Sequence, residues 1–169
     1  ANGIINSGAL GQFPPALEEL HGASVQAAII SLYSLVGIFG KIFIGWINDK
    51  FGVVVSATYG CIMFGLAFVF MLLSQNTNML YIMAVVFGFG NAIGTVIPPL
   101  VTSEVFGMEK YPEAYGMVNS ATQVGLSLGS LLVASMYDLN GSYTLAWMLL
   151  LVLTAVTLFS WVGSCLAAK

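Results

Sequence analysis

One lysine lies inside a strongly apolar stretch of this sequence. Lys41 belongs to the segment GKIFIGWINDKFG, residues 40–52, and stands eight residues before Asp49. In a helix this separation is about 12 Å, so the ammonium would lie well inside an apolar span. An ammonium at that depth needs an anion, and the apolar stretches contain no carboxylate. Lys41 is therefore a candidate to bind a substrate carboxylate; the alternative is that its side chain extends to the membrane interface.

Three stretches carry small or polar residues three or four positions apart, which places them on one face of a helix. The three sets are Ser34, Gly37, Lys41, Gly45 and Asn48; Asn91, Thr95, Pro98 and Thr102; and Asn119, Gln123, Ser127 and Ser130. We predict that these faces line a wet cavity, because polar side chains in a bilayer face protein or water. The alternative for the serines, threonines and glycines is simple helix packing.

Within these sets we separate substrate ligands from lining residues. The predicted substrate-binding residues are Lys41, Asn91 and Gln123, whose ammonium and amide groups can bind a polar substrate. The residues predicted to line the cavity are Ser34, Gly37, Thr95 and Asn119.

The composition indicates a membrane protein. The 169 residues are 59% hydrophobic and 7% charged, with a mean hydropathy of +0.95. Soluble domains have about 25% charged residues, so this chain has too few to cover a water-facing surface. The net charge of -3 is spread along the chain without a basic patch, which excludes nucleic acid as a partner.

The residues for metal or nucleophilic chemistry are missing from the sequence. His21 is the only histidine, and Cys61 and Cys165 both lie in apolar runs without metal-binding spacing. We therefore predict no metal and no cofactor. An enzyme would need a nucleophile with a base, or a metal, at membrane depth, so we predict that the protein is not an enzyme.

Five stretches are long and apolar enough to cross a bilayer, which takes about 20 residues each. They are residues 25–46, 53–73, 79–101, 114–136 and 143–167. Backbone in a bilayer must satisfy its own hydrogen bonds, so we predict an all-α, polytopic membrane helix bundle. Residues 1–13 are too short to cross, and we interpret them as the end of a truncated sixth helix.

The lysines predict the orientation of these five spans. If the spans alternate, Lys50, Lys110 and Lys169 fall on one side of the membrane. The acidic residues Glu18, Glu19 and Asp138 fall on the other side, together with His21. Since cytoplasmic loops carry an excess of lysine and arginine, the C-terminus is predicted to be cytoplasmic in a multi-pass protein.

Glycines and prolines mark two places where the helices bend or pack closely. Gly90, Gly94 and Pro98 follow one another at four-residue steps, and Pro99 comes next, so the third span is predicted to bend. Gly125 and Gly129 form a GxxxG ridge in the fourth span. One interpretation is that this ridge makes a self-standing small membrane protein dimerise into a transporter or channel.

The segment GWINDKFG, residues 45–52, resembles the signature loop of the major facilitator superfamily through Gly45, Asp49, Lys50 and Gly52. A second likeness supports this one. The segments SEVFGMEKYPEAYGMVNS and YDLNGSYTLAW look like helices ten to twelve of the branch that contains oxalate:formate antiporters and monocarboxylate transporters.

The resemblance covers the chain from about Pro14 onward and implies half of a major facilitator fold. The five spans would be helices eight to twelve, residues 1–13 the end of helix seven, and the missing N-terminal half a partner of this chain. The implied function is secondary active transport of a small organic anion by alternating access in the plasma or inner membrane. Lys41 stands where the branch usually has arginine, and helix eleven has no lysine, Gln123 being the nearest candidate. A single point charge favours a monocarboxylate.

The resemblance also gives the loop residues roles in gating. Gly45 would let two helices approach, and Gly52 would allow a tight turn. Asp49 would meet the positive end of a helix. We predict that Lys50 pairs with Glu104, because both end spans on the same face, and that this pair biases which side of the transporter is open.

Overall fold

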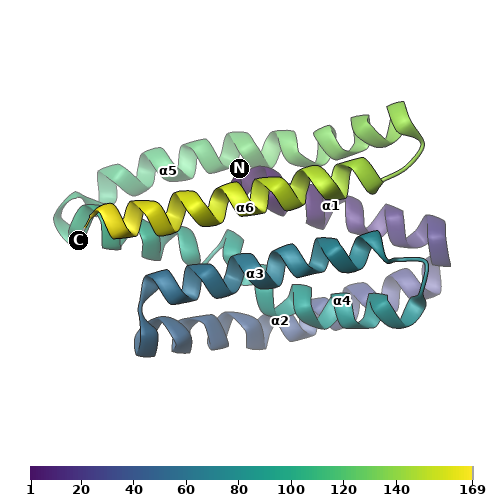
Figure 1. Cartoon of the computed structure of the whole chain (residues 1–169), viewed down its shortest axis with the longest axis horizontal. Helices are drawn as coiled ribbons and strands as arrows, with labels where there is room; N and C mark the ends of the chain where they lie inside the picture. The colour runs from purple at the N-terminus through teal and green to yellow at the C-terminus, as the bar shows by residue number, and fades with distance from the viewer. Residues whose placement is uncertain (169) are drawn as a thin grey trace.

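The computed structural model describes residues 1–168 of the chain. In that range the regular structure is helical, which confirms the all-α prediction (Figure 1). The elements are α1 (Asn2–His21), α2 (Ala23–Phe51), α3 (Val53–Leu72), α4 (Thr77–Gly90), the short 3₁₀ helix η1 (Asn91–Gly94), α5 (Ile97–Asn140) and α6 (Thr144–Ala167).

The first helix is longer than the sequence analysis predicts. Instead of ending at residue 13, α1 continues through Pro14 and Pro15 to His21. Each proline removes one backbone N–H from the helix but leaves its path unbroken here. The carbonyl of Pro14 accepts a hydrogen bond from the Gln26 side chain at 3.0 Å, which ties the end of α1 to α2.

The GxxxG ridge of α5 is used inside the chain, where it packs against α1. A Cβ on Gly125 would lie 3.1 Å from Gly3 Cα, and one on Gly129 would overlap the Ile4 carbonyl. Small residues on both helices thus allow backbone-to-backbone approach. The ridge is therefore covered by α1 and is not available as the dimer surface that the second interpretation requires.

A second close crossing joins α2 to α4. A Cβ on Gly40 would lie 2.5 Å from the Gly88 carbonyl oxygen and 2.8 Å from Phe89 Cα. Only glycine fits at this contact. Because Lys41 follows Gly40 and Asn91 comes three residues after Gly88, the crossing sets the position of both polar side chains.

The third predicted span, 79–101, is not one continuous helix. It is divided among α4, η1 and the start of α5, with Thr95 and Val96 between the last two. Pro98 and Pro99 have no N–H for the carbonyls four residues earlier, and their rings clash with those carbonyls. The bend that the prolines predict is therefore a complete break in the α-helix.

Residues 102–113, which lie between the third and fourth predicted spans, were expected to form a loop. Most of this segment is helical instead. Helical structure continues from Ile97 to Asn140 except at Gly107, where φ is 71° and ψ is 165°. A positive φ of this size is open mainly to glycine, and it turns the chain sharply.

Four helical stretches of the described residues are long and apolar enough to cross a membrane. They are Ala23–Phe51, Val53–Leu72, Thr77–Asn140 and Thr144–Ala167. The third includes both the break before Ile97 and the turn at Gly107, so it joins the third and fourth predicted spans.

The centre of the bundle is an aromatic cluster. Phe13 lies 4.9 Å from Phe87 and 5.2 Å from Trp147 between ring centroids, and Phe64 lies 5.5 Å from Phe68. Such edge-on and tilted ring pairs add to the free energy gained by burial. The cluster connects α1, α3, α4 and α6.

The turns gather at two ends of the bundle. The α2–α3 turn, the Gly107 turn and the end of α6 lie on the left in Figure 1, and the α1–α2, α3–α4 and α5–α6 turns lie on the right. Lys50 therefore lies at the end opposite Glu19 and Asp138. Lys169 lies outside the described residues.

Candidate functional site

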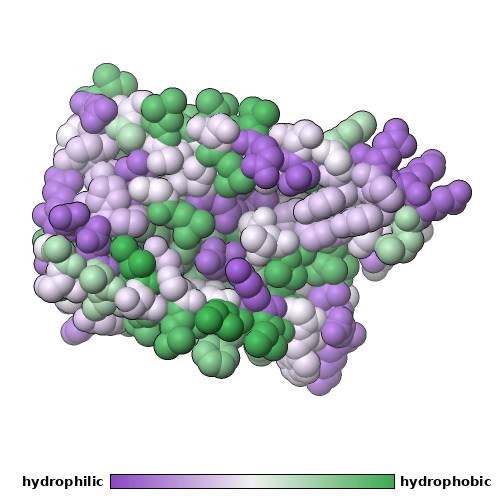
Figure 2. All heavy atoms as spheres, turned by 180° about the vertical axis from the view of Figure 1, so that it is seen from behind, coloured by the Kyte–Doolittle hydropathy of each residue, from purple (hydrophilic) through white to green (hydrophobic). Residues whose placement is uncertain are grey.

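A cavity of about 210 Å³ lies between α1, α2, η1 and α5. Its lining residues are Asn6, Leu10, Lys41, Asn91, Gly94, Thr95, Thr122 and Leu126. Figure 2 shows the face formed by α1, α2 and α5, with polar side chains in the middle of the face as well as at its two ends. The structure thus brings together three predicted residues, Lys41, Asn91 and Thr95.

Lys41 supplies the only charge among the residues that line this cavity. Its side chain is exposed within this chain and has no hydrogen-bond or ion-pair partner among the described residues. Leu10 and Leu126 form an apolar part of the cavity wall. An ammonium in such surroundings favours an anion, since the lining offers no carboxylate of its own.

Asn91 lies where α4 ends and η1 begins, opposite Gly37 of α2. A Cβ on Gly37 would lie 3.6 Å from Asn91 Nδ2, which is an ordinary van der Waals distance, so the buried glycine and the amide face each other across the two helices. No hydrogen bond of the Asn91 side chain is formed with the described residues. The amide therefore offers two N–H donors and a carbonyl acceptor to a ligand.

The broken helix adds backbone acceptors to the same wall. Gly94 and Thr95 both line the cavity, and their carbonyls are those that Pro98 and Pro99 leave without the usual N–H donor. The backbone N–H groups of Thr95 and Val96 both donate to the Ala92 carbonyl, at 3.2 and 2.8 Å. The break is thus an ordered turn.

Two cavity residues, Asn6 and Thr122, are not among the sequence predictions. Asn6 is buried, and its Nδ2 donates to the backbone and side-chain oxygens of Asn2 at 3.1 and 3.2 Å. Thr122 Oγ1 donates to the Val118 carbonyl at 2.9 Å. Asn6 carried a usable signal, an amide within an apolar and small-residue run. Thr122 directly precedes Gln123 in the sequence. The rotation of α5 about its axis determines that Thr122, and not Gln123, lines the cavity.

The other predicted substrate and lining residues do not line this cavity. Ser34 on α2 and Asn119 and Gln123 on α5 are exposed at the surface of this chain. Gly37 does not line the cavity either; it is buried opposite the Asn91 amide. The roles of all four in binding or lining remain predictions.

The α2–α3 turn has the glycine geometry that its sequence predicts at one of two positions. Gly52 has φ 85° and ψ 173°, and its N–H donates to the Asn48 carbonyl at 2.8 Å. Gly45 is different, because a Cβ there would meet no described atom within 4 Å. The predicted close helix approach at Gly45 is therefore not formed within the described chain.

Lys50 packs against aromatic rings in this conformation. Its Nζ lies 5.1 Å from the centroid of the Trp46 ring and 5.4 Å from that of Phe51, which is cation–π geometry. Asp49 and Glu104 are both exposed. The Lys50–Glu104 pairing remains a prediction.

The sequence model of the Major Facilitator Superfamily matches residues 1–166, so the chain belongs to this superfamily of transporters. The chain is 29% identical over 152 residues to monocarboxylate transporter 9 of Pongo abelii. The matched region covers 82% of the chain and 29% of that protein. It is 27% identical over 135 residues to monocarboxylate transporter 12 of Homo sapiens, which covers 76% of the chain and 26% of that protein.

These findings confirm the resemblance to the superfamily and its monocarboxylate transporter branch. They place the chain among transporters and not among enzymes. The chain spans less than a third of the length of either relative.

Proposed function

We propose that this chain is the C-terminal half of a secondary transporter that carries a small monocarboxylate by alternating access. The observation that carries the proposal is the unpartnered Lys41 ammonium at a cavity that it shares with Asn91 and Thr95. The ammonium would bind the carboxylate of the substrate, and the amide of Asn91 would bind its remaining polar atoms.

The helices support five membrane crossings. The stretch Thr77–Asn140 has 64 residues, about 96 Å of helix, whereas a bilayer core is about 30 Å thick. The Gly107 turn lies at the same end of the bundle as the α2–α3 turn, so the stretch crosses once before it and once after it. With the other three candidate helices this makes five crossings.

The surface of the chain supports a partner half. Ser34, Asn119 and Gln123 are exposed at the face that carries the cavity, and so are apolar residues such as Ile38 and Val124. In transporters built from two helical repeats, the substrate site lies between the repeats near the middle of the bilayer. The N-terminal half would cover this face, while lipid surrounds the rest.

The broken helix supports the alternating-access mechanism. Interrupted helices at a substrate site provide free backbone groups and a place to bend. Here the break at residues 91–96 forms part of the cavity wall. The Lys50 end would be cytoplasmic, because lysine is enriched on that side.

The charge of the cavity favours one carboxylate per substrate. A dicarboxylate would bring a second negative charge, and the lining residues hold only one cation. Lysine also lacks the planar fork with which arginine binds carboxylates in two-point fashion. A second cation would have to come from the other half.

Transport by the full-length protein in liposomes tests this proposal. Uptake of a labelled two- to four-carbon monocarboxylate should be saturable and inhibited by other monocarboxylates. Oxalate, succinate and organic cations of similar size should inhibit weakly. Equal inhibition by dicarboxylates would contradict the assigned substrate class.

A further inference from the structure

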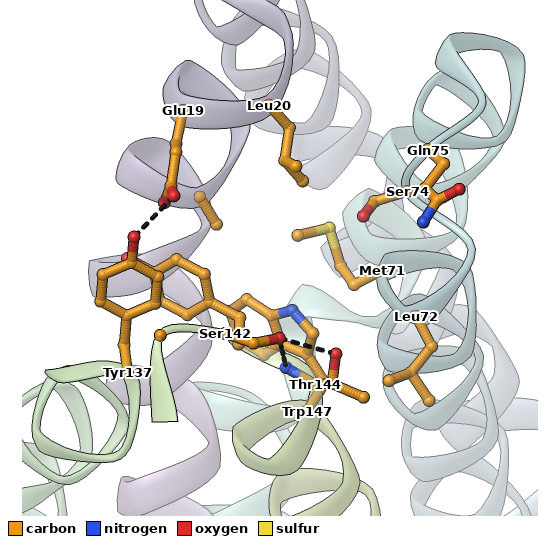
Figure 3. A pocket seen from close by; sticks show the side chains of 13 residues that line it. Glu19, Leu20, Met71, Leu72, Ser74, Gln75, Tyr137, Ser142, Thr144 and Trp147 are labelled. Carbon is orange, nitrogen blue, oxygen red and sulfur yellow. Dashed lines mark hydrogen bonds between the residues drawn. The ribbon is translucent and has the colours of Figure 1, made fainter. Parts of the chain in front are cut away.

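A second cavity, of about 190 Å³, lies at the end of the bundle opposite the Lys50 turn. It is formed by the end of α1, the α3–α4 turn and the α5–α6 turn (Figure 3). It shares no lining residue with the Lys41 cavity. Nothing in the proposed transport cycle uses it.

Trp147 aims an unpaired donor into this cavity. The side chain is 3% exposed, and its ring is stacked between Tyr143 at 5.4 Å and Phe68 at 6.2 Å. Its indole nitrogen faces the cavity in Figure 3, and no described residue accepts its N–H. The N–H is accessible from the cavity, so a ligand that carries an acceptor can pair with it.

Ser74 offers a second unpaired donor on the α3–α4 side of the cavity. It is 8% exposed, and its hydroxyl has no partner among the described residues. Its backbone carbonyl accepts a hydrogen bond from His21 Nε2 at 2.6 Å, which holds this turn against the end of α1. A ligand with an oxygen acceptor can therefore bind both the Trp147 N–H and the Ser74 hydroxyl.

The opposite wall of the cavity is acidic. Glu19 Oε1 accepts a hydrogen bond from the Tyr137 hydroxyl at 2.6 Å, and its other oxygen has no partner among the described residues. Glu18 and Asp138 lie at the same end of the bundle, and Lys41 and Lys50 lie elsewhere. The electrostatic field at this wall therefore favours a cation.

We propose that this cavity binds a small organic ammonium compound that also carries an oxygen acceptor. The ammonium binds Glu19, and the oxygen accepts from the Trp147 N–H and the Ser74 hydroxyl. A dry cavity of about 150 Å³ holds benzene, so 190 Å³ suits a ligand of roughly six to eight non-hydrogen atoms. Free amino alcohols and the ethanolamine headgroup of a lipid share this chemistry.

The test is a titration of the full-length protein in phosphatidylcholine nanodiscs, followed by ligand-observed NMR. The probes are straight-chain amino alcohols with two to five carbons. The matched controls are n-butylamine, which lacks the oxygen, and n-butanol, which lacks the ammonium. The best amino alcohol should bind at least about tenfold more tightly than either control, because each contact is worth about that factor.

Three variants assign the contacts. Glu19→Gln keeps an acceptor for Tyr137 but removes the charge, and Trp147→Phe keeps an aromatic ring but removes the N–H. Each should weaken amino alcohol binding about tenfold. Glu18→Gln is the control, because Glu18 bonds Gln26 at 3.3 Å and does not line the cavity. It should bind as the parent does.

The proposal is overturned if butylamine and butanol bind as tightly as the amino alcohols, or if Glu19→Gln binds with unchanged affinity. Nanodiscs that contain phosphatidylethanolamine identify the source of the ligand. Weaker amino alcohol binding in them supports occupancy by the lipid headgroup, and equal binding supports a soluble amine. Because the readout is binding at this cavity, it does not depend on whether monocarboxylates are transported.

Discussion

Replacing Gly40 with alanine should loosen the crossing that sets the Lys41 cavity. The new Cβ would lie 2.5 Å from the Gly88 carbonyl oxygen, so α2 and α4 must separate by at least about 0.5 Å. Backbone lies against backbone, and no side chain can rotate away. We therefore assign a cost of about 3 kcal/mol, at the upper end for overpacking. Alanine recovers about 1 kcal/mol through its helix propensity.

The net loss of about 2 kcal/mol should lower the melting temperature by about 4–8 °C for a unit of this size. Thermal unfolding of the purified protein in detergent measures this change in melting temperature. Gly163→Ala is the matched control, because this exposed glycine of α6 has no described atom near a new Cβ. It should be neutral or stabilising by up to about 1 kcal/mol. A Gly40→Ala protein as stable as Gly163→Ala would refute the close crossing.

Three further predictions concern the turn, the gate and the cavity wall. Gly52→Ala should destabilise the protein by about 1–3 kcal/mol in thermal unfolding. The cost comes from the backbone conformation alone, φ 85° and ψ 173°, because a Cβ there meets no described atom within 4 Å. Exchanging the charges of Lys50 and Glu104 together should restore the transport that each single neutralisation loses; no recovery would disprove the pairing. Gly94→Ala should destabilise by about 1–3 kcal/mol, because its Cβ overlaps the Asn6 amide. Adding Asn6→Ser should recover part of that stability, and no recovery would contradict the contact.

Sequence reasoning predicted the helical class and the approach of Lys41, Asn91 and Thr95. Apolar stretches of about 20 residues predict helices, and a three- or four-residue spacing identifies one face of each. Which faces then meet is decided by a few glycine crossings between helices. Glycines that make such crossings, as Gly40 does, look the same in the sequence as Gly45, which packs against no described residue.

The errors have three physical causes. Polar residues in 102–113 look like a loop, yet the chain remains helical on both sides of one glycine, Gly107, because local hydrogen bonds suffice outside the apolar core. Gln123 and Thr122 differ by 100° around α5, and only the packing of α5 on α1 directs the threonine toward the cavity. Asn6 was missed because the predicted helix end at residue 13 left the face of α1 unassigned.

Anion binding by Lys41 variants tests the central claim most directly. The full-length protein would be purified as the parent, Lys41→Gln and Lys41→Arg, and monocarboxylate affinity would be measured by isothermal titration calorimetry. A charged hydrogen bond contributes about 1.5–3 kcal/mol, so Lys41→Gln should weaken binding at least about tenfold while melting temperature stays the same. Lys41→Arg should retain part of the affinity. Unchanged affinity in a folded Lys41→Gln protein would contradict the assignment and leave Lys41 as a side chain that extends to the membrane interface.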